Sequence, residues 1–120
     1  MAFYIGLMSG TSMDGIDAAL VELDGAGGAS LAATHTEPFP APLHQSIVNL
    51  SQYRGTPDDL GHCDRAVGEL FARAARNLLE SSGHQGPVTA IGSHGQTIRH
   101  QPLGDDPFTL QLGDPNVIAE

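Results

Sequence analysis

The segment spanning residues 3–24 constrains the fold of this 120-residue chain more than any other. Its pattern predicts two apolar strands, Phe3–Met8 and Ile16–Asp24, joined by a turn of small and polar residues. Gly10 and Gly15 allow the positive φ angles and the close backbone approach that a tight turn demands. Backbone N–H groups in such a turn can surround an anion, and hydroxyl groups can donate to phosphate oxygens. The segment therefore predicts a hairpin that presents a phosphate-binding turn.

The turn by itself leaves a second interpretation open, because Asp-Gly is also a common dipeptide in ordinary hairpin loops. Its two carboxylates, Asp14 and Asp17, could hold Mg²⁺ directly or through the waters of the ion. A solvated hairpin residue is an equally good interpretation of Asp17.

Charge and composition exclude several functions. The formal net charge is −9, which argues against nucleic-acid binding and against an anionic membrane surface. The chain contains no lysine, so it can hold neither a Walker A loop nor the strand lysine of protein kinases. Phosphate binding in this chain must therefore use backbone N–H groups, hydroxyls, a metal ion or arginine.

Three further features concern the cellular setting. Cys63 is the single cysteine, which rules out an intrachain disulfide and favours a buried structural thiol. The first residues lack the basic region and the uninterrupted apolar run of a secretory signal. No run of about 18 apolar residues is present, so no transmembrane span is expected. These features favour a cytoplasmic protein.

The rest of the chain predicts an α/β fold. The expected elements after the hairpin are an edge strand at Ser30–Phe39, helices at Leu43–Gln52 and Thr56–Gly83, strands at Val88–Gly92 and Phe108–Leu112, and a helix capped by Asp114. Three antiparallel strands, a helical crossover and strands parallel to the first predict a mixed five-stranded sheet with flanking helices. This order resembles the ribonuclease-H-like lobe of the actin, Hsp70 and hexokinase superfamily.

A second polar segment, Ser93–Thr97, follows the predicted strand Val88–Gly92. Ligands in open α/β sheets bind at the carboxyl ends of strands. The amide of Gln96 and the hydroxyl of Thr97 suit sugar hydroxyls or an acetamido carbonyl. His94 could contact the same substrate or could be a structural residue with internal partners.

Three motifs, taken together, resemble the anhydro-N-acetylmuramic acid kinase family. They read Met-Ser-Gly-Thr-Ser-Met-Asp-Gly-Ile-Asp from Met8, Ile-Gly-Ser-His-Gly-Gln-Thr-Ile-Arg-His from Ile91 and Thr-Leu-Gln-Leu-Gly-Asp-Pro-Asn from Thr109. Family members are much longer, so the resemblance implies that residues 1–120 form the N-terminal lobe of a two-lobed sugar kinase, with the second lobe absent from this chain.

The resemblance implies ATP and Mg²⁺ as cofactors and a small amino sugar as substrate. It assigns the nucleotide to Gly10, Thr11, Ser12, Met13, Asp14, Gly15, Ile16 and Asp17, the metal to Asp14, and the substrate to His94, Gln96 and Thr97. Met8 is a departure from the wider superfamily, which usually has an Mg²⁺-binding aspartate at that position of the first strand. This departure moves the expected metal ligand to Asp14, with Asp17 second.

The implied reaction converts 1,6-anhydro-N-acetylmuramic acid, ATP and water to N-acetylmuramic acid 6-phosphate and ADP, a step of peptidoglycan recycling. The base of the family is an aspartate expected beyond Glu120, so no catalytic residue is assigned here and residues 1–120 alone are expected to be inactive. A homodimer is compatible with this interpretation.

Two alternatives stay open: a kinase of another sugar on the same fold, and a nucleotide-dependent assembly or regulatory module without sugar chemistry.

Two residues near the later motifs have competing interpretations. Asp114 suits a helix N-cap better than a catalytic role. Arg99 could pair with the lactyl carboxylate of the substrate or with a local acid, Asp105 or Asp106.

Overall fold

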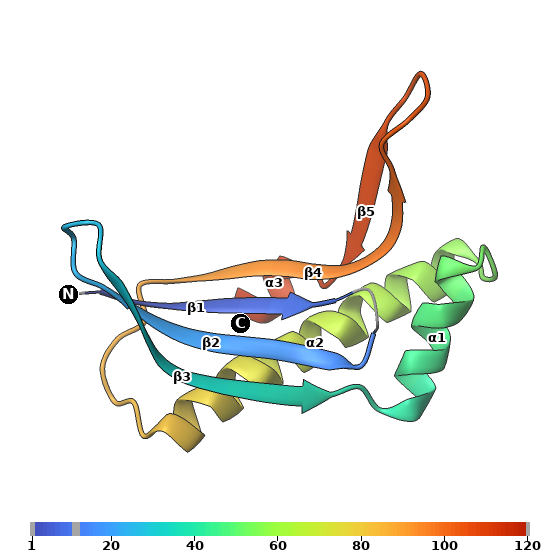
Figure 1. Ribbon diagram of the computed structural model, residues 1–120. Helices are drawn as coiled ribbons and strands as arrows, with labels where there is room; N and C mark the ends of the chain where they lie inside the picture. Colours follow the sequence, from blue (N-terminus) through green and yellow to red (C-terminus); the bar gives the residue numbers. More distant parts are fainter. Residues whose placement is uncertain (1, 11–12, 120) are drawn as a thin grey trace.

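The computed structural model describes residues 2–10 and 13–119 as one α/β unit (Figure 1). Its elements are β1 (Ala2–Ser9), β2 (Gly15–Leu23), β3 (Ala29–Pro38), α1 (Ala41–Ser51), α2 (Pro57–Ser82), β4 (Ala90–Gln101), β5 (Phe108–Leu112) and α3 (Pro115–Ala119). The type and order of all eight elements agree with the sequence prediction.

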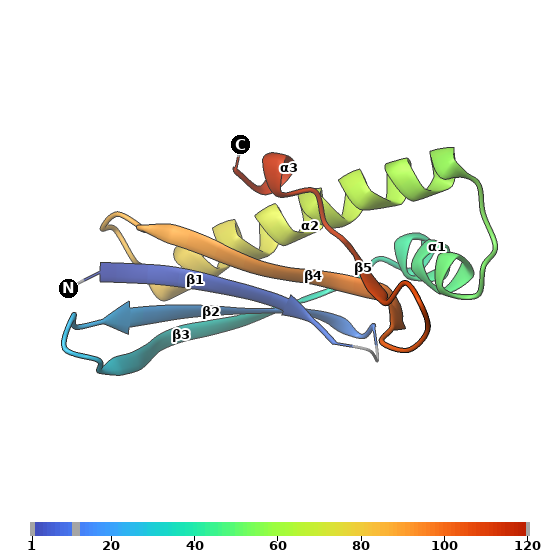
Figure 2. The ribbon, with the colours of Figure 1, turned by 90° about the horizontal axis from the view of Figure 1, so that it is seen from above.

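The five strands form one mixed sheet in the order β3-β2-β1-β4-β5. The central strand β1 runs antiparallel to β2 and parallel to β4, while β3 lies at an edge as predicted. In Figure 2 the helices lie on one side of this sheet, with α2 running along it. Within the described residues, the opposite face of the sheet has no helix over it. The predicted fold class, a ribonuclease-H-like lobe with a mixed five-stranded sheet, is confirmed.

The core lies between the sheet and α2. Alternate residues of β1 and β2 point toward the helix, including Ile5, Leu7 and Ile16, each at most 2% exposed. Helix α2 supplies an apolar stripe, in which Phe71 and Leu78 are fully buried. Most of the apolar burial that stabilises the lobe is therefore shared between one helix and the three central strands.

Both ends of α2 are fixed by capping interactions that the sequence predicts. Thr56 and Asp59 form a reciprocal capping box, in which the Thr56 hydroxyl accepts from the Asp59 backbone N–H at 3.2 Å. Gly83 ends the helix in the left-handed conformation, with φ 71°. Gly68 lets α2 lie close to the start of α3, since a Cβ there would lie 3.0 Å from the backbone N of Asp114.

Cys63 lies on the buried face of α2, as predicted, and is 4% exposed. Burial, with a smaller contribution from the neighbouring Asp64 carboxylate, raises the pKa of the Cys63 thiol to about 11. A thiol that stays protonated at neutral pH is a packing group and not a nucleophile. None of the helices in the described residues combines the length and apolarity that a membrane span requires.

The strand β4 differs from its prediction. The expected strand ended at Gly92, with Ser93–Thr97 at its carboxyl end, whereas β4 continues through this segment to Gln101. Beyond β1, antiparallel pairing with β5 provides the hydrogen bonds that keep the chain extended, and the two strands leave the sheet as a projecting hairpin (Figure 1). The polar segment Ser93–Thr97 is therefore part of a strand, and its prediction as the segment that follows the strand was wrong.

A bulge at Gly95 accommodates this change of partner. Leu7 pairs with Ser93 but Ser9 pairs with Gln96, so β4 contains one more residue than β1 between these two pairs. Gly95 has φ 75°, and a Cβ there would lie 2.5 Å from the backbone oxygen of Leu112. Both the backbone conformation and the space therefore require glycine at this position.

We expect Gly95→Ala to lower the free energy of unfolding by about 2–3 kcal/mol, because it combines an unfavourable backbone region with a backbone clash. The matched control is Gly92→Ala on the same strand, where a Cβ has no neighbour within 4 Å. Urea unfolding followed by circular dichroism measures both variants. Equal midpoints for the two variants would show that the bulge does not need glycine.

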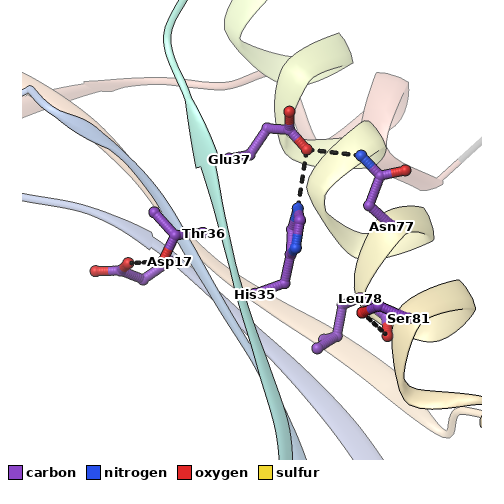
Figure 3. A network of polar contacts seen from close by, with 7 residues as sticks. All are labelled: Asp17, His35, Thr36, Glu37, Asn77, Leu78 and Ser81. Carbon is purple, nitrogen blue, oxygen red and sulfur yellow. Dashed lines mark hydrogen bonds and ion pairs between the residues drawn. The ribbon is translucent and has the colours of Figure 1, made fainter.

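A polar network joins the edge strand β3 to α2 (Figure 3). His35 and Asn77 both contact Oε1 of Glu37, at 3.0 Å and 2.7 Å. The hydrogen bond from His35, together with that from Asn77 and the charges of His35 and Arg73, outweighs partial burial and lowers the pKa of the Glu37 carboxyl. The ionised carboxylate is therefore the form that the folded state prefers.

This lowered pKa predicts a pH dependence of stability. The contribution of Glu37 is complete above its ordinary pKa of 4.5 and is lost as the pH falls through its lower folded value. We expect Glu37→Gln to flatten the decline of the melting temperature below about pH 5, since the glutamine cannot titrate. Glu80→Gln on the exposed side of α2 is the control, and it should follow the wild-type profile.

Candidate functional site: the turn after the central strand

The predicted phosphate turn lies between β1 and β2, at the carboxyl end of the central strand. The Met13 backbone N–H donates to the Gly10 carbonyl at 3.1 Å, and Met13 has φ 58°. A non-glycine residue in the left-handed region is uncommon, and such residues concentrate at turns and ligand sites. Two predicted nucleotide contacts, Thr11 and Ser12, lie outside the described residues.

The residues after the turn enter β2 and divide between its two faces. Gly15 passes close to β3, where a Cβ would lie 2.8 Å from the backbone oxygen of Glu37. Ile16 is fully buried in the core, so only its backbone could meet a nucleotide. Glycine and isoleucine at these positions thus fix the path of the chain between the turn and the sheet.

The two candidate metal ligands are both exposed. Asp14 lies in the bend before β2, and Asp17 lies on β2 directly opposite Met8 of β1. The Thr36 hydroxyl donates to Asp17 Oδ1 at 3.0 Å, which holds that carboxylate in place. Met8 is 53% exposed on the helix-free side of the sheet. A carboxylate is therefore present beside the position where the superfamily has its aspartate, but on the neighbouring strand.

The donor set of the turn fits a magnesium ion that is bound together with phosphates. Mg²⁺ is commonly held by one or two carboxylates with water and substrate phosphates, and not by a cage made only of protein groups. In residues 2–10 and 13–119, no three His, Cys, Asp or Glu side chains converge as a metal site. Asp14 and Asp17 supply two exposed carboxylates at the turn, which is a number that such a magnesium ion commonly takes from a protein.

The bulge in β4 brings Gln96 to the base of the turn. The Ser9 hydroxyl donates to Gln96 Oε1, while Gln96 Nε2 donates to the Gly10 carbonyl at 3.3 Å and to the Thr97 carbonyl at 3.0 Å. Gln96 is fully buried, and both hydrogens of its amide have protein acceptors. The sequence places Gln96 and the turn in separate sites, whereas in the structure they are in direct contact.

The other two candidate substrate contacts lie elsewhere on β4. His94 is exposed on the helix-free side of the sheet, and it lines an open hollow of about 640 Å³ together with Asp17 and Met8. The Thr97 hydroxyl accepts from Gln111 Nε2 at 3.2 Å. The structure thus brings His94 and Asp17 to one surface, and it places Thr97 against β5.

Asp64 of α2 supports this region and was missed by sequence reasoning. Its Oδ1 accepts from the Gly113 backbone N–H at 2.8 Å, and its carbonyl accepts from the Asp114 N–H at 3.3 Å. The sequence feature that could have identified it is the position of Asp64 three residues before Val67, on the apolar face of α2. A charged residue on such a face needs a specific partner.

The structure gives internal partners for the two ambiguous residues near the hairpin, Asp114 and Arg99. Asp114 Oδ1 accepts from the Asn116 backbone N–H at 2.9 Å, which confirms the predicted N-cap of α3. The Arg99 guanidinium lies over the Tyr53 ring at 5.8 Å, so it stacks on an aromatic ring instead of pairing with Asp105 or Asp106.

These features define an α/β lobe of the ribonuclease-H-like type with a polar turn at the carboxyl end of its central strand. The family model described as anhydro-N-acetylmuramic acid kinase matches residues 2–120. The anhydro-N-acetylmuramic acid kinase of Shewanella amazonensis is 52% identical over 120 residues, covering 98% of this chain and 32% of the relative. That of Coxiella burnetii (strain Dugway 5J108-111) is 51% identical over 120 residues, covering 97% of this chain and 31% of the relative.

The chain belongs to the anhydro-N-acetylmuramic acid kinase family. It spans about a third of the length of the curated relatives that it matches.

Proposed function

We propose that the protein containing this chain phosphorylates 1,6-anhydro-N-acetylmuramic acid with ATP and opens its anhydro ring with water. Water adds to C1, the bond between C1 and O6 breaks, and O6 receives the γ-phosphoryl group to give N-acetylmuramic acid 6-phosphate and ADP. The observation that carries the proposal is the position of the Gly10–Asp14 turn, at the carboxyl end of the central strand of a chain in this family.

In this proposal the chain contributes the N-terminal lobe of a two-lobed kinase. The Gly10–Asp17 segment binds the phosphates of ATP through backbone N–H groups, since the chain contains no lysine that could do so. Asp14 holds Mg²⁺, with Asp17 as the second candidate, and the bound ion neutralises phosphate charge. The base that activates water lies in the part of the protein that follows residue 120.

The sugar would lie against β4. His94 is exposed beside Asp17, where it can reach a ligand on the helix-free side of the sheet. Thr97 offers a hydroxyl near the bulge, and the predicted sugar contact of Gln96 would compete with its protein partners. A cytoplasmic location and a homodimer belong to the same proposal.

The proposed reaction predicts a specific product in ¹⁸O-labelled water. The full-length protein with Mg-ATP and 1,6-anhydro-N-acetylmuramic acid should yield a phosphorylated, ring-opened sugar with one ¹⁸O atom at C1, measured by mass spectrometry. Residues 1–120 alone should yield no product, because the base lies outside them. Unchanged sugar would exclude this reaction and favour another sugar substrate or a sugar-independent nucleotide module, and turnover by residues 1–120 would refute the position of the base.

Asp14→Asn in the full-length protein should lower kcat by at least about 100-fold and raise the Mg²⁺ concentration needed for half-maximal activity. Loss of groups that only support a metal ligand already costs about 10–100-fold, so loss of the ligand charge should cost more. Asp105→Asn, in the exposed loop of the β4–β5 hairpin, is the matched control and should retain wild-type turnover. Near-normal turnover of Asp14→Asn would transfer the metal role to Asp17.

A further inference from the structure

Ser9 and Gln96 are the two buried polar side chains in the described part of the chain, and they bond to each other. They lie 87 positions apart in the sequence, on the two strands that form the parallel pair. Burial of an amide in a protein core is unfavourable unless its hydrogen-bonding groups find partners. The bond between Ser9 and Gln96 satisfies both side chains and ties β1 to β4 at the end of β1 that enters the turn.

The contacts of Gln96 converge on the first residue of the turn. The Gly10 carbonyl accepts from Gln96 Nε2 at 3.3 Å and from the Met13 N–H at 3.1 Å. The first donor comes from β4 and the second from the turn itself, so the carbonyl is held from two sides. Gln96 therefore fixes the orientation of the peptide unit from which the phosphate turn begins.

The bulge in β4 places Gln96 opposite Ser9, from where its side chain reaches the Gly10 carbonyl. If β4 kept a regular register after the Leu7–Ser93 pair, Ser9 would pair with Gly95, which has no side chain, instead of Gln96. Gly95 packs against the backbone of Leu112 and Gly113, and Asp64 of α2 holds Gly113. A continuous set of contacts thus leads from α2 through the bulge to the turn.

We propose that Gln96 is a positioning residue, which acts through the Gly10 carbonyl to hold the peptide unit that begins the phosphate turn in the orientation that nucleotide binding requires. It does not itself contact the sugar. The inference rests on the proposed function only in that the turn is taken to bind a nucleotide. It assigns to Gln96 an effect on nucleotide affinity that a sugar contact would not have.

Two variants of the full-length protein separate the contact to Gly10 from the rest of the network. Ser9→Ala removes the hydroxyl but leaves the bond from Gln96 Nε2 to the Gly10 carbonyl. The double variant Ser9→Ala with Gln96→Met removes both polar partners in a volume-conserving way, so that no buried hydroxyl is left without its acceptor. Gln101→Met, the same substitution further along β4, is the control.

The readout is the dissociation constant of Mg-ADP, measured calorimetrically without sugar, beside the sugar KM and the melting temperature. We expect the double variant to bind Mg-ADP about tenfold more weakly than Ser9→Ala, which corresponds to one hydrogen bond. Its sugar KM and melting temperature should stay close to those of Ser9→Ala. Gln101→Met should match the wild type.

Other outcomes distinguish the inference from the proposed function. An unchanged Mg-ADP constant with a raised sugar KM would overturn the inference and return Gln96 to the sugar site, with the proposed function intact. A weakened Mg-ADP constant in a protein that does not convert the anhydro sugar would support the inference while the proposed reaction fails. If the wild type does not bind Mg-ADP, the inference is overturned.

Discussion

The parallel pairing of β1 with β4 is the interaction on which the rest of this lobe depends. It places the amino-terminal strand at the centre of the sheet, although its partner follows about 80 residues later in the chain. The helical crossover through α2 makes this pairing feasible, because parallel strands cannot be joined by a tight turn. Every other strand is attached to this pair by an antiparallel neighbour: β2 and β3 on one side, β5 on the other. The carboxyl end of β1 consequently has a hydrogen-bonded strand on each side, β2 and β4.

The support of the turn is therefore tertiary and not local. The turn contributes its own bond between Met13 and Gly10, but the partners that anchor its first residue come from β4. The close approach of Gly95 to Leu112 and the bond from Gly113 to Asp64 then connect β4 to β5 and α2. Such an arrangement anchors Gly10 from the neighbouring strand without a bulky side chain at that position that would obstruct a ligand.

Much of the fold followed from local patterns, and the parts that did not follow depend on long-range pairing. The Thr56 cap, the Gly83 stop and the apolar stripe of α2 are local signals, and the structure confirms them. The extent of β4 escaped prediction because two glycines resemble a turn, whereas Gly92 lies in the sheet and Gly95 forms a bulge against β5. Gln96 resembled a ligand contact for the same reason, since only the bulge turns its side chain inward toward Ser9.

The chemistry proposed for the turn is shaped by what the chain lacks. Without lysine, positive charge for a polyphosphate must come from a metal ion, from arginine or from oriented backbone N–H groups. With Met8 in place of the usual strand aspartate, the carboxylates that this segment offers to such an ion are those of Asp14 and Asp17. Asp14 is the last residue of the turn and Asp17 follows it on β2, so a rotation of the Gly10 peptide would change the distance between the N–H groups and the carboxylates. The proposed site therefore depends more on the position of Gly10 than a site in which a strand residue holds the metal independently of the turn. The bonds from Gln96 Nε2 and from the Met13 N–H to the Gly10 carbonyl hold that position.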